Sequence, residues 1–192
     1  MAILNREIYE VNGKQTFFKV KANAFNIGKV LFAFVEFDTN NNKLKNNIDI
    51  YMPISDMLLF CNDVLSGKLP QQATNAAKEN SNFPPPVFTV QGGTNAEKAG
   101  RADKKAQARV INFGASSRAG SFLFQALTGP GKVTEKGLIS LENPTKPEVR
   151  INVPCSSDDL KKLCLSFKAD YEAWLSGMYA RREFNEEYKQ NK

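Results

Sequence analysis

A strand-to-helix junction occurs twice in this sequence and limits the folds open to it. The segment IYMPISD at residues 50–56 matches the segment INVPCSSD at residues 151–158 when one inserted residue is allowed. Each segment follows a stretch of strand-like alternation and precedes apolar residues at helical spacing. Two such junctions in one chain favour a duplicated unit of several strands followed by one helix. The alternative is that unrelated strand-turn-helix connections carry similar residues.

Strand patterns dominate both halves before their helices. The predicted strands are residues 16–21, 28–37, 47–52, 87–90, 109–113, 121–127, 137–142 and 149–153. Upstream of the two junctions, the Phe-Ala-Phe sequence at residues 32–34 has a counterpart in the Phe-Leu-Phe sequence at residues 122–124. The run Thr128-Gly-Pro-Gly131 predicts a turn.

One predicted helix follows each set of strands. The first runs from Ser55, its expected N-cap, to a Leu-Ser-Gly sequence at residues 65–67. The second begins after Ser156 or Ser157 and ends at a second Leu-Ser-Gly sequence at residues 175–177. Beyond it we expect a charged tail that forms a frayed or partner-dependent helix.

The predicted fold is α+β: two repeated units, each an antiparallel β-meander followed by an α-helix, packed as an intramolecular pseudo-dimer. The first unit covers residues 1–69 and the second, with the tail, covers residues 86–192. Residues 70–85 between them are small, polar or proline and predict a flexible linker. Residues 92–108 predict a second flexible stretch. Whether the halves form one domain or two stays open.

The sequence offers little for catalysis or for a metal. It contains no histidine, which removes the commonest general base and the favoured zinc ligand. The three cysteines form no CxxC pair, and Gly129-Pro-Gly131-Lys132 lacks the spacing of a phosphate loop. We therefore expect no catalytic residues, no metal, no cofactor and no enzymatic activity. No apolar run approaches the ~20 residues of a membrane span, and the first residues lack a signal-peptide pattern, so we expect a cytoplasmic protein without membrane partners.

Binding signals are more informative. The net charge of +6 favours phosphate-rich partners. Strand alternation places Phe17 beside Lys19 and Lys21, and sequence-tolerant single-strand binders combine aromatic rings that stack on bases with cations that neutralise phosphates. Turn residues and the second half extend this pattern. The predicted interface consists of Phe17, Lys19, Lys21, Lys29, Lys43, Lys45, Arg101, Lys104, Lys105, Arg109, Phe113, Arg118 and Lys132.

Each of these residues has a structural alternative. Phe17 and Phe113 fit a hydrophobic core as well as an interface, and lysines are ordinarily solvated surface residues.

Repeated strands that end in a helix, with basic and aromatic sheet residues, resemble the Whirly and transcriptional-positive-cofactor type of single-strand-binding fold. The pattern also resembles the Pur-alpha type, which duplicates the same general unit within one chain. The resemblance rests on the two junctions at 50–56 and 151–158 and covers about residues 14–67 and 86–177. The Whirly-type element Lys-Gly-Lys-Ala-Ala-Leu is absent, and the nearest sequence is IGKVLF at residues 27–32. The resemblance implies binding of melted DNA on a curved sheet, without catalysis.

The leading hypothesis is a single-stranded DNA-binding protein acting in phage or mobile-element replication or recombination. RNA remains open as a ligand, and so does self-association into a homo-oligomer. The alternatives are an assembly protein that oligomerises through its sheet edges, a binder of duplex or structured RNA, and an enzyme with a metal held by carboxylates.

Overall fold

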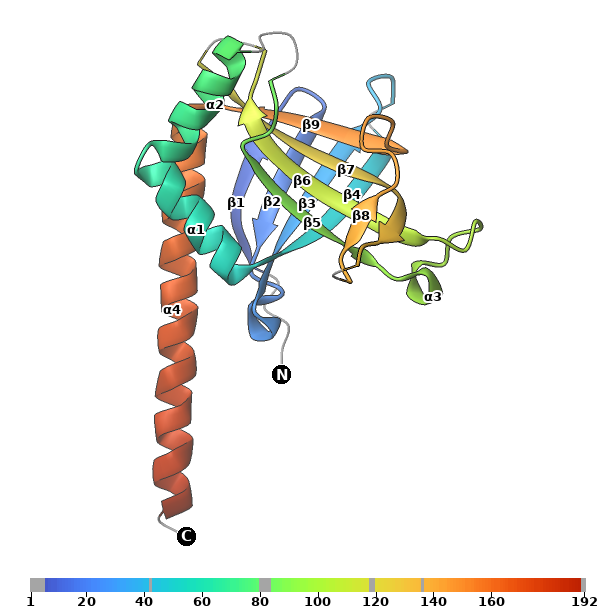
Figure 1. The fold of residues 1–192 in the computed structure, drawn as a ribbon. Coiled ribbons are helices and arrows are strands. Elements are labelled where there is room, and N and C mark those ends of the chain that lie inside the picture. Colours follow the sequence, from blue (N-terminus) through green and yellow to red (C-terminus); the bar gives the residue numbers. More distant parts are fainter. Residues whose placement is uncertain (1–5, 42, 80–83, 118–119, 136, 191–192) are drawn as a thin grey trace.

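The computed structural model describes residues 6–41, 43–79, 84–117, 120–135 and 137–190, with side chains described through Arg181 (Figure 1). Sheet A is an antiparallel meander of β1 (Glu7–Asn12), β2 (Thr16–Lys21), β3 (Lys29–Phe37) and β4 (Leu44–Pro53). Sheet B contains β5 (Phe88–Thr94), β6 (Ala106–Ala115), β7 (Phe122–Val133), β8 (Ile139–Leu141) and β9 (Val149–Cys155). Both β8 and β9 pair with β7, at different ends of that strand.

The helices are α1 (Ile54–Leu65), α2 (Lys68–Glu79), the short α3 (Ala96–Ala99), α4 (Ser157–Gln190) and the 3-10 turn η1 (Phe25–Ile27). In Figure 1, α1, α2 and α4 gather on one side of the sheets, and α4 extends far beyond them. The predicted α+β class with antiparallel sheets and packed helices is confirmed. No helix in the described part of the chain is long and apolar enough to cross a membrane.

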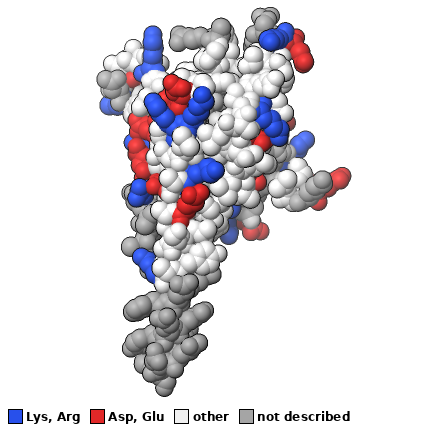
Figure 2. All heavy atoms as spheres, turned by 90° about the vertical axis from the view of Figure 1, so that its left-hand side faces the viewer, with Lys and Arg blue, Asp and Glu red and all other residues white. Residues whose placement is uncertain are grey.

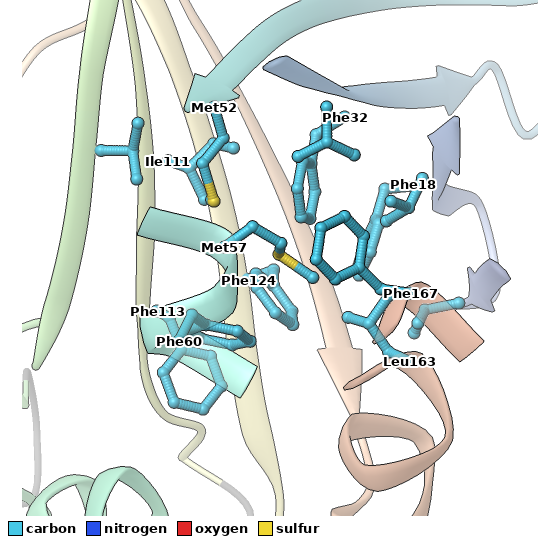
Figure 3. Close-up of a cluster of buried hydrophobic side chains, with 14 of the residues drawn as sticks. Phe18, Phe32, Met52, Met57, Phe60, Ile111, Phe113, Phe124, Leu163 and Phe167 are labelled. Atoms are coloured by element: carbon cyan, nitrogen blue, oxygen red, sulfur yellow. The ribbon is translucent and has the colours of Figure 1, made fainter. Parts of the chain in front are cut away.

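One hydrophobic core lies between the two sheets and under the helices. Sheet A contributes Phe18 and Phe32, and sheet B contributes Phe113 and Phe124, all at most 1% exposed. Figure 3 shows these rings in one cluster with Phe60 of α1. The rings of Phe18 and Phe124 meet edge to face at 4.7 Å between centroids. Because rings from both halves pack on one another, neither sheet buries its apolar face without the other.

The predicted linker is wrong between residues 70 and 79, where the chain forms α2. Leu69 and Ala73 are four residues apart on one helix face and are buried. Pro70 lies in the first turn, where its missing N–H leaves no helical bond unmade. Two further alanines at positions 76 and 77, the best helix formers, lie in its second half. Residues 80–83 of the predicted linker lie outside the described residues.

Helix α4 does not end at Gly177 as predicted but continues to Gln190. Glycine in a helix interior costs about 1 kcal/mol relative to alanine, which is too little to end a long helix. At its start, the predicted Ser156 cap is confirmed: Ser156 Oγ accepts a hydrogen bond from the Asp159 N–H at 3.1 Å. At α1 the expected cap is wrong, since Pro53 occupies the N-cap position and Ser55 lies inside the helix.

The run predicted as a turn at residues 128–131 lies inside β7, so that prediction is wrong. Gly129 pairs with Ala108, and Gly131 pairs with Ala106. Here β8 lies over the sheet, and a Cβ atom at Gly131 would be 2.6 Å from Ile139 Cγ2 and 3.0 Å from the Ala108 nitrogen. The glycine therefore serves close approach of β8 rather than a reversal of the chain.

We expect Gly131→Ala to lower the free energy of unfolding by about 1–3 kcal/mol, because its methyl group would displace Ile139 and the β6 backbone. Urea titration measures the change. The control is Gly177→Ala, where the added methyl has nothing within 4 Å and should raise stability by about 0.5–1 kcal/mol. Equal stability of Gly131→Ala and the unmodified protein would contradict this packing.

Candidate nucleic-acid interface

The outer face of sheet A, which points away from the core, brings together part of the predicted interface. On β2 the side chains of Phe18 and Val20 are fully buried, so Phe17, Lys19 and Lys21 lie on the opposite face. This alternation was predicted and is confirmed. Residues opposite them on β3 and β4 extend the same face, since the register between these strands is regular up to Glu36.

An aromatic pair lies at one end of this face. The rings of Phe17 and Phe37 stack at 5.7 Å with an interplanar angle of 30°, and both are partly exposed. The ammonium group of Lys19 lies 5.6 Å from the centre of the Phe17 ring. Two partly exposed rings on one sheet face are groups on which an unpaired base can stack.

Lys19 is an internal partner rather than a free cation. Its Nζ lies 2.8 Å from Glu7 Oε2 and 2.6 Å from Glu10 Oε2. Hydrogen bonds to Glu10 and Glu7 raise the pKa of Lys19, and the hydrogen bond from Lys19 lowers the pKa of Glu10. Two carboxylates thus offset its charge, so Lys19 is a poor candidate for a phosphate contact.

A second aromatic side chain, Tyr51, is 47% exposed on the same face. The register runs from Lys21 on β2 through Leu31 on β3 to Tyr51 on β4, and Lys29 lies two residue pairs further on, at the start of β3. Among the ion pairs between described residues, none involves Lys21 or Lys29. An exposed ring therefore shares this sheet face with two lysines that enter no ion pair between described residues. Tyr51 was not predicted, although its alternation with the buried Ile50 and Met52 marks it as outward-facing.

Phe113 cannot serve as a stacking platform, and its inclusion in the interface is contradicted by its burial. It is fully buried, and its ring packs on those of Phe60, Phe122 and Phe124 at centroid distances of 5.1–5.7 Å. Arg109 lies on the same strand face but beyond the core, opposite Thr128. There its Nη1 donates a hydrogen bond to Thr94 Oγ1 at 3.0 Å.

The distal end of sheet B, formed by residues 94–109 and 128–150, contains the other basic candidates. Arg101 is 14% exposed there and binds two carboxylates. Its guanidinium lies 2.6 Å from Glu148 Oε1 and 2.8 Å from Asp103 Oδ2, and it donates to Gln107 Oε1 at 2.8 Å. These contacts order a segment predicted to be flexible, and α3 lies within it. Arg101 is thus a structural clamp rather than a free phosphate ligand.

The remaining basic candidates differ in whether a carboxylate already pairs with them. Lys105 pairs with Glu142 at 2.6 Å and Lys45 with Glu36 at 2.9 Å. Three other lysines are exposed and enter no ion pair between described residues: Lys43, Lys104 and Lys132. Arg118 lies outside the described residues. Two groups therefore form, one on sheet A and one at the distal end of sheet B.

The helical side of the molecule offers a contrast. Figure 2 faces this side, and its basic and acidic side chains are interspersed rather than gathered by sign. Such mixed charge gives a polyanion no preferred track.

The ion network around Arg101 predicts acid sensitivity. Its hydrogen bonds lower the pKa of Asp103 from an ordinary 3.8 to about 2, and they also lower the pKa of Glu148. Groups with lowered folded-state pKa values stabilise the fold above their unfolded pKa and lose that effect as the pH falls. We expect Arg101→Ala to flatten the decline of Tm between about pH 4 and pH 2, relative to a Lys98→Ala control. Parallel pH profiles for the two variants would contradict a role for this network.

The described residues contain no group of three or more His, Cys, Asp or Glu side chains placed to hold a metal ion.

Comparisons with known proteins give one structural likeness. No protein-family model matches the chain, and no curated protein matches it. The chain is similar to the structure of the plant transcriptional regulator PBF-2. The TM-score is 0.49 at 8% identity, over 96% of this chain and 90% of that one. A likeness at this level carries no argument about ligands.

Proposed function

We propose that this protein binds single-stranded DNA, with little sequence preference, on the outer face of sheet A. The observation that carries the proposal is Tyr51, an exposed ring on the same sheet face as Lys21 and Lys29, neither of which forms an ion pair with another described residue. The stacked pair of Phe17 and Phe37 provides a second aromatic site on the same face.

The physical basis is stacking combined with phosphate neutralisation. Stacking of a base on an aromatic side chain is worth about 1–3 kcal/mol and tolerates any base, since every base has a π face. Each phosphate neutralised by a lysine releases condensed counterions, which makes binding weaken as salt rises. Duplex DNA hides its base faces, so the aromatic side chains should favour unpaired strands.

The distal end of sheet B supports the proposal with charge. Its described residues include eight basic and five acidic side chains, which leaves an excess of three positive charges. The basic set is Lys98, Arg101, Lys104, Lys105, Arg109, Lys132, Lys146 and Arg150, and the acidic set is Glu97, Asp103, Glu135, Glu142 and Glu148. This excess would attract nucleic acid before it docks.

We also propose that the two halves of the chain are an internal duplication. Both sheets are antiparallel, and their last strands, β4 and β9, lead directly into α1 and α4. Phe32 and Phe34 on β3 and Phe122 and Phe124 on β7 occupy the third strand of each sheet. We infer that the halves arose from one unit and pack as a pseudo-dimer. A role in phage or mobile-element replication or recombination would fit such a binder.

A second candidate function is self-assembly, because α4 extends beyond the sheets (Figure 1). Tyr179 on this extension is 55% exposed, and Trp174 and Met178 are partly exposed. Under this hypothesis the protein forms homo-oligomers whose mass is insensitive to salt and independent of nucleic acid. Light scattering of the protein alone distinguishes it from a monomer.

Fluorescence anisotropy tests the leading proposal. A labelled oligo-dT of about 30 nucleotides exceeds the ~4–16-nucleotide sites typical of single-strand-binding modules. We expect oligo-dT binding to weaken steeply as the salt concentration rises and to resist competition by duplex DNA. RNA of equal length should bind more weakly than DNA. Stronger competition by RNA would reassign the ligand, and an absence of binding at low salt would refute the proposal.

A further inference from the structure

A groove opens where three connections of the chain meet. A volume of about 860 Å³ is lined by residues 12–16 between β1 and β2, by Ser116, Ser117, Gly120 and Ser121 between β6 and β7, and by Pro154, Cys155, Ser156 and Asp159 where β9 meets α4. We call it the turn groove. The predicted interface does not include any of its described lining residues, and none of them is aromatic.

Hydrogen-bonding side chains line the turn groove from both sheets. The β1–β2 turn contributes Asn12, Lys14 and Gln15, all exposed. The β6–β7 turn contributes serines, of which Ser117 is exposed. Lysine, serine, asparagine and glutamine are side chains that commonly contact the phosphates and sugars of nucleic acids, and apolar stacking groups are missing here.

The one carboxylate of the groove is already occupied. Asp159 Oδ2 accepts hydrogen bonds from the Ser156 N–H at 3.1 Å and the Ser156 hydroxyl at 2.7 Å. Tyr9 donates to Asp159 Oδ1 at 3.4 Å. The bonds from Ser156 lower the pKa of Asp159, so it is ionised at neutral pH, and its charge is directed into these donors and the start of α4. Lys14, by contrast, enters no ion pair between described residues.

The turn groove adjoins the aromatic pair on the outer face of sheet A. Asn12, which lines the groove, pairs with Phe17 in the β1–β2 register, and the Phe37 N–H donates a hydrogen bond to the carbonyl oxygen of Gln15, another lining residue, at 2.9 Å. A strand whose bases stack on Phe17 and Phe37 would therefore bring its next phosphates to Lys14 and Gln15.

From this geometry we propose that the turn groove binds the sugar-phosphate backbone of the same strand that stacks on sheet A. The inference rests on the proposed function and extends it to a second site, with Lys14 as the cation and Asn12, Gln15 and Ser117 as neutral donors. The bound strand then spans both halves of the chain, because the groove has walls from sheet A and from sheet B.

Thiol protection tests occupancy directly. The three native cysteines are buried, so a Ser117→Cys variant offers one exposed thiol to an alkylating reagent. We expect oligo-dT to slow alkylation at this position and to leave a control, Ser66→Cys at the exposed end of α1, unchanged. Binding of the oligonucleotide without protection of position 117 overturns the inference and leaves the proposed function standing. Protection by inorganic phosphate alone would show a simple anion site and would also overturn it.

A substitution gives the energetic counterpart. Removing one phosphate-contacting lysine lowers the salt slope on a single strand by about 0.7. We expect Lys14→Ala with Gln15→Ala to weaken oligo-dT binding by about tenfold with this change in slope, whereas Lys78→Ala on the exposed face of α2 changes neither. Unchanged affinity and an unchanged salt slope would contradict binding of the strand in the turn groove and would leave the proposed function standing. If the unmodified protein binds no oligonucleotide, both proposals fail.

Discussion

Replacing Phe124 with alanine is expected to lower the free energy of unfolding by about 3–5 kcal/mol. The side chain is 1% exposed. Its ring lies 4.7 Å from that of Phe18 in sheet A, 5.8 Å from that of Phe60 in α1 and 5.1 Å from that of Phe113 in sheet B. A cavity at this point would remove contacts from both sheets and from a helix at once. Since domains of this kind are stable by about 5–15 kcal/mol, such a loss takes a large share of the total.

Urea denaturation followed by fluorescence and by circular dichroism measures this effect. Val133→Ala, at the other end of the same strand and 64% exposed, is the matched control and should change stability by less than about 0.5 kcal/mol. Because rings from the two halves interlock, both probes should report one transition for all three proteins. Two separate transitions, or a loss at Phe124 no larger than the control, would contradict a core shared by the two sheets.

The sheets could be predicted because alternation encodes burial. Phe18 and Val20 alternate with Lys19 and Lys21, and a strand with one buried face has no other register available. The same holds for the strand at residues 47–52, whose Ile48, Ile50 and Met52 are all buried. Strand β1 was missed because Ile8, Tyr9 and Val11 alternate poorly, and the register with β2 shifts between Glu7 and Tyr9.

Errors arose where tertiary packing outweighs a local signal. Gly129, Pro130 and Gly131 are typical of a turn, yet β8 needs the space above them, and the strand continues. Helix α2 has a polar composition that is typical of linkers. Its two buried positions, Leu69 and Ala73, become informative only once a surface is present to receive them.

Charge pairing is the part of the candidate site that no sequence pattern could supply. Lys19 and Lys21 look equivalent in sequence, but two glutamates of β1 bind the first and none binds the second. Arg101 meets Glu148 across 47 residues of chain. Ion pairs between such distant positions follow from the sheet register and the path of loops, so the sequence indicated a basic surface without showing which cations are free.

The largest functional effect is expected at Tyr51. Tyr51→Ala should weaken oligo-dT binding by about 1–3 kcal/mol, the range for loss of one stacked base, which corresponds to roughly fivefold to 150-fold. Tyr179→Ala is the matched control, because this tyrosine is similarly exposed but lies on α4, away from sheet A. Anisotropy at two salt concentrations measures both, and the Tyr51 substitution should leave the salt slope unchanged, since stacking releases no counterions.

The lysines on the same sheet face as Tyr51 should act on the salt slope instead. Lys21→Ala with Lys29→Ala removes two unpaired cations and should reduce the slope by about 1.4, at roughly 0.7 per phosphate contact on a single strand. Lys19→Ala should not reduce the slope, because Glu7 and Glu10 already occupy that ammonium group. It should weaken binding through the carboxylates that it leaves unpaired beside the strand. If Lys19 rather than Lys21 and Lys29 governed the slope, the strand would have to displace both glutamates, and the aromatic pair at Phe17 would replace Tyr51 as the centre of the site.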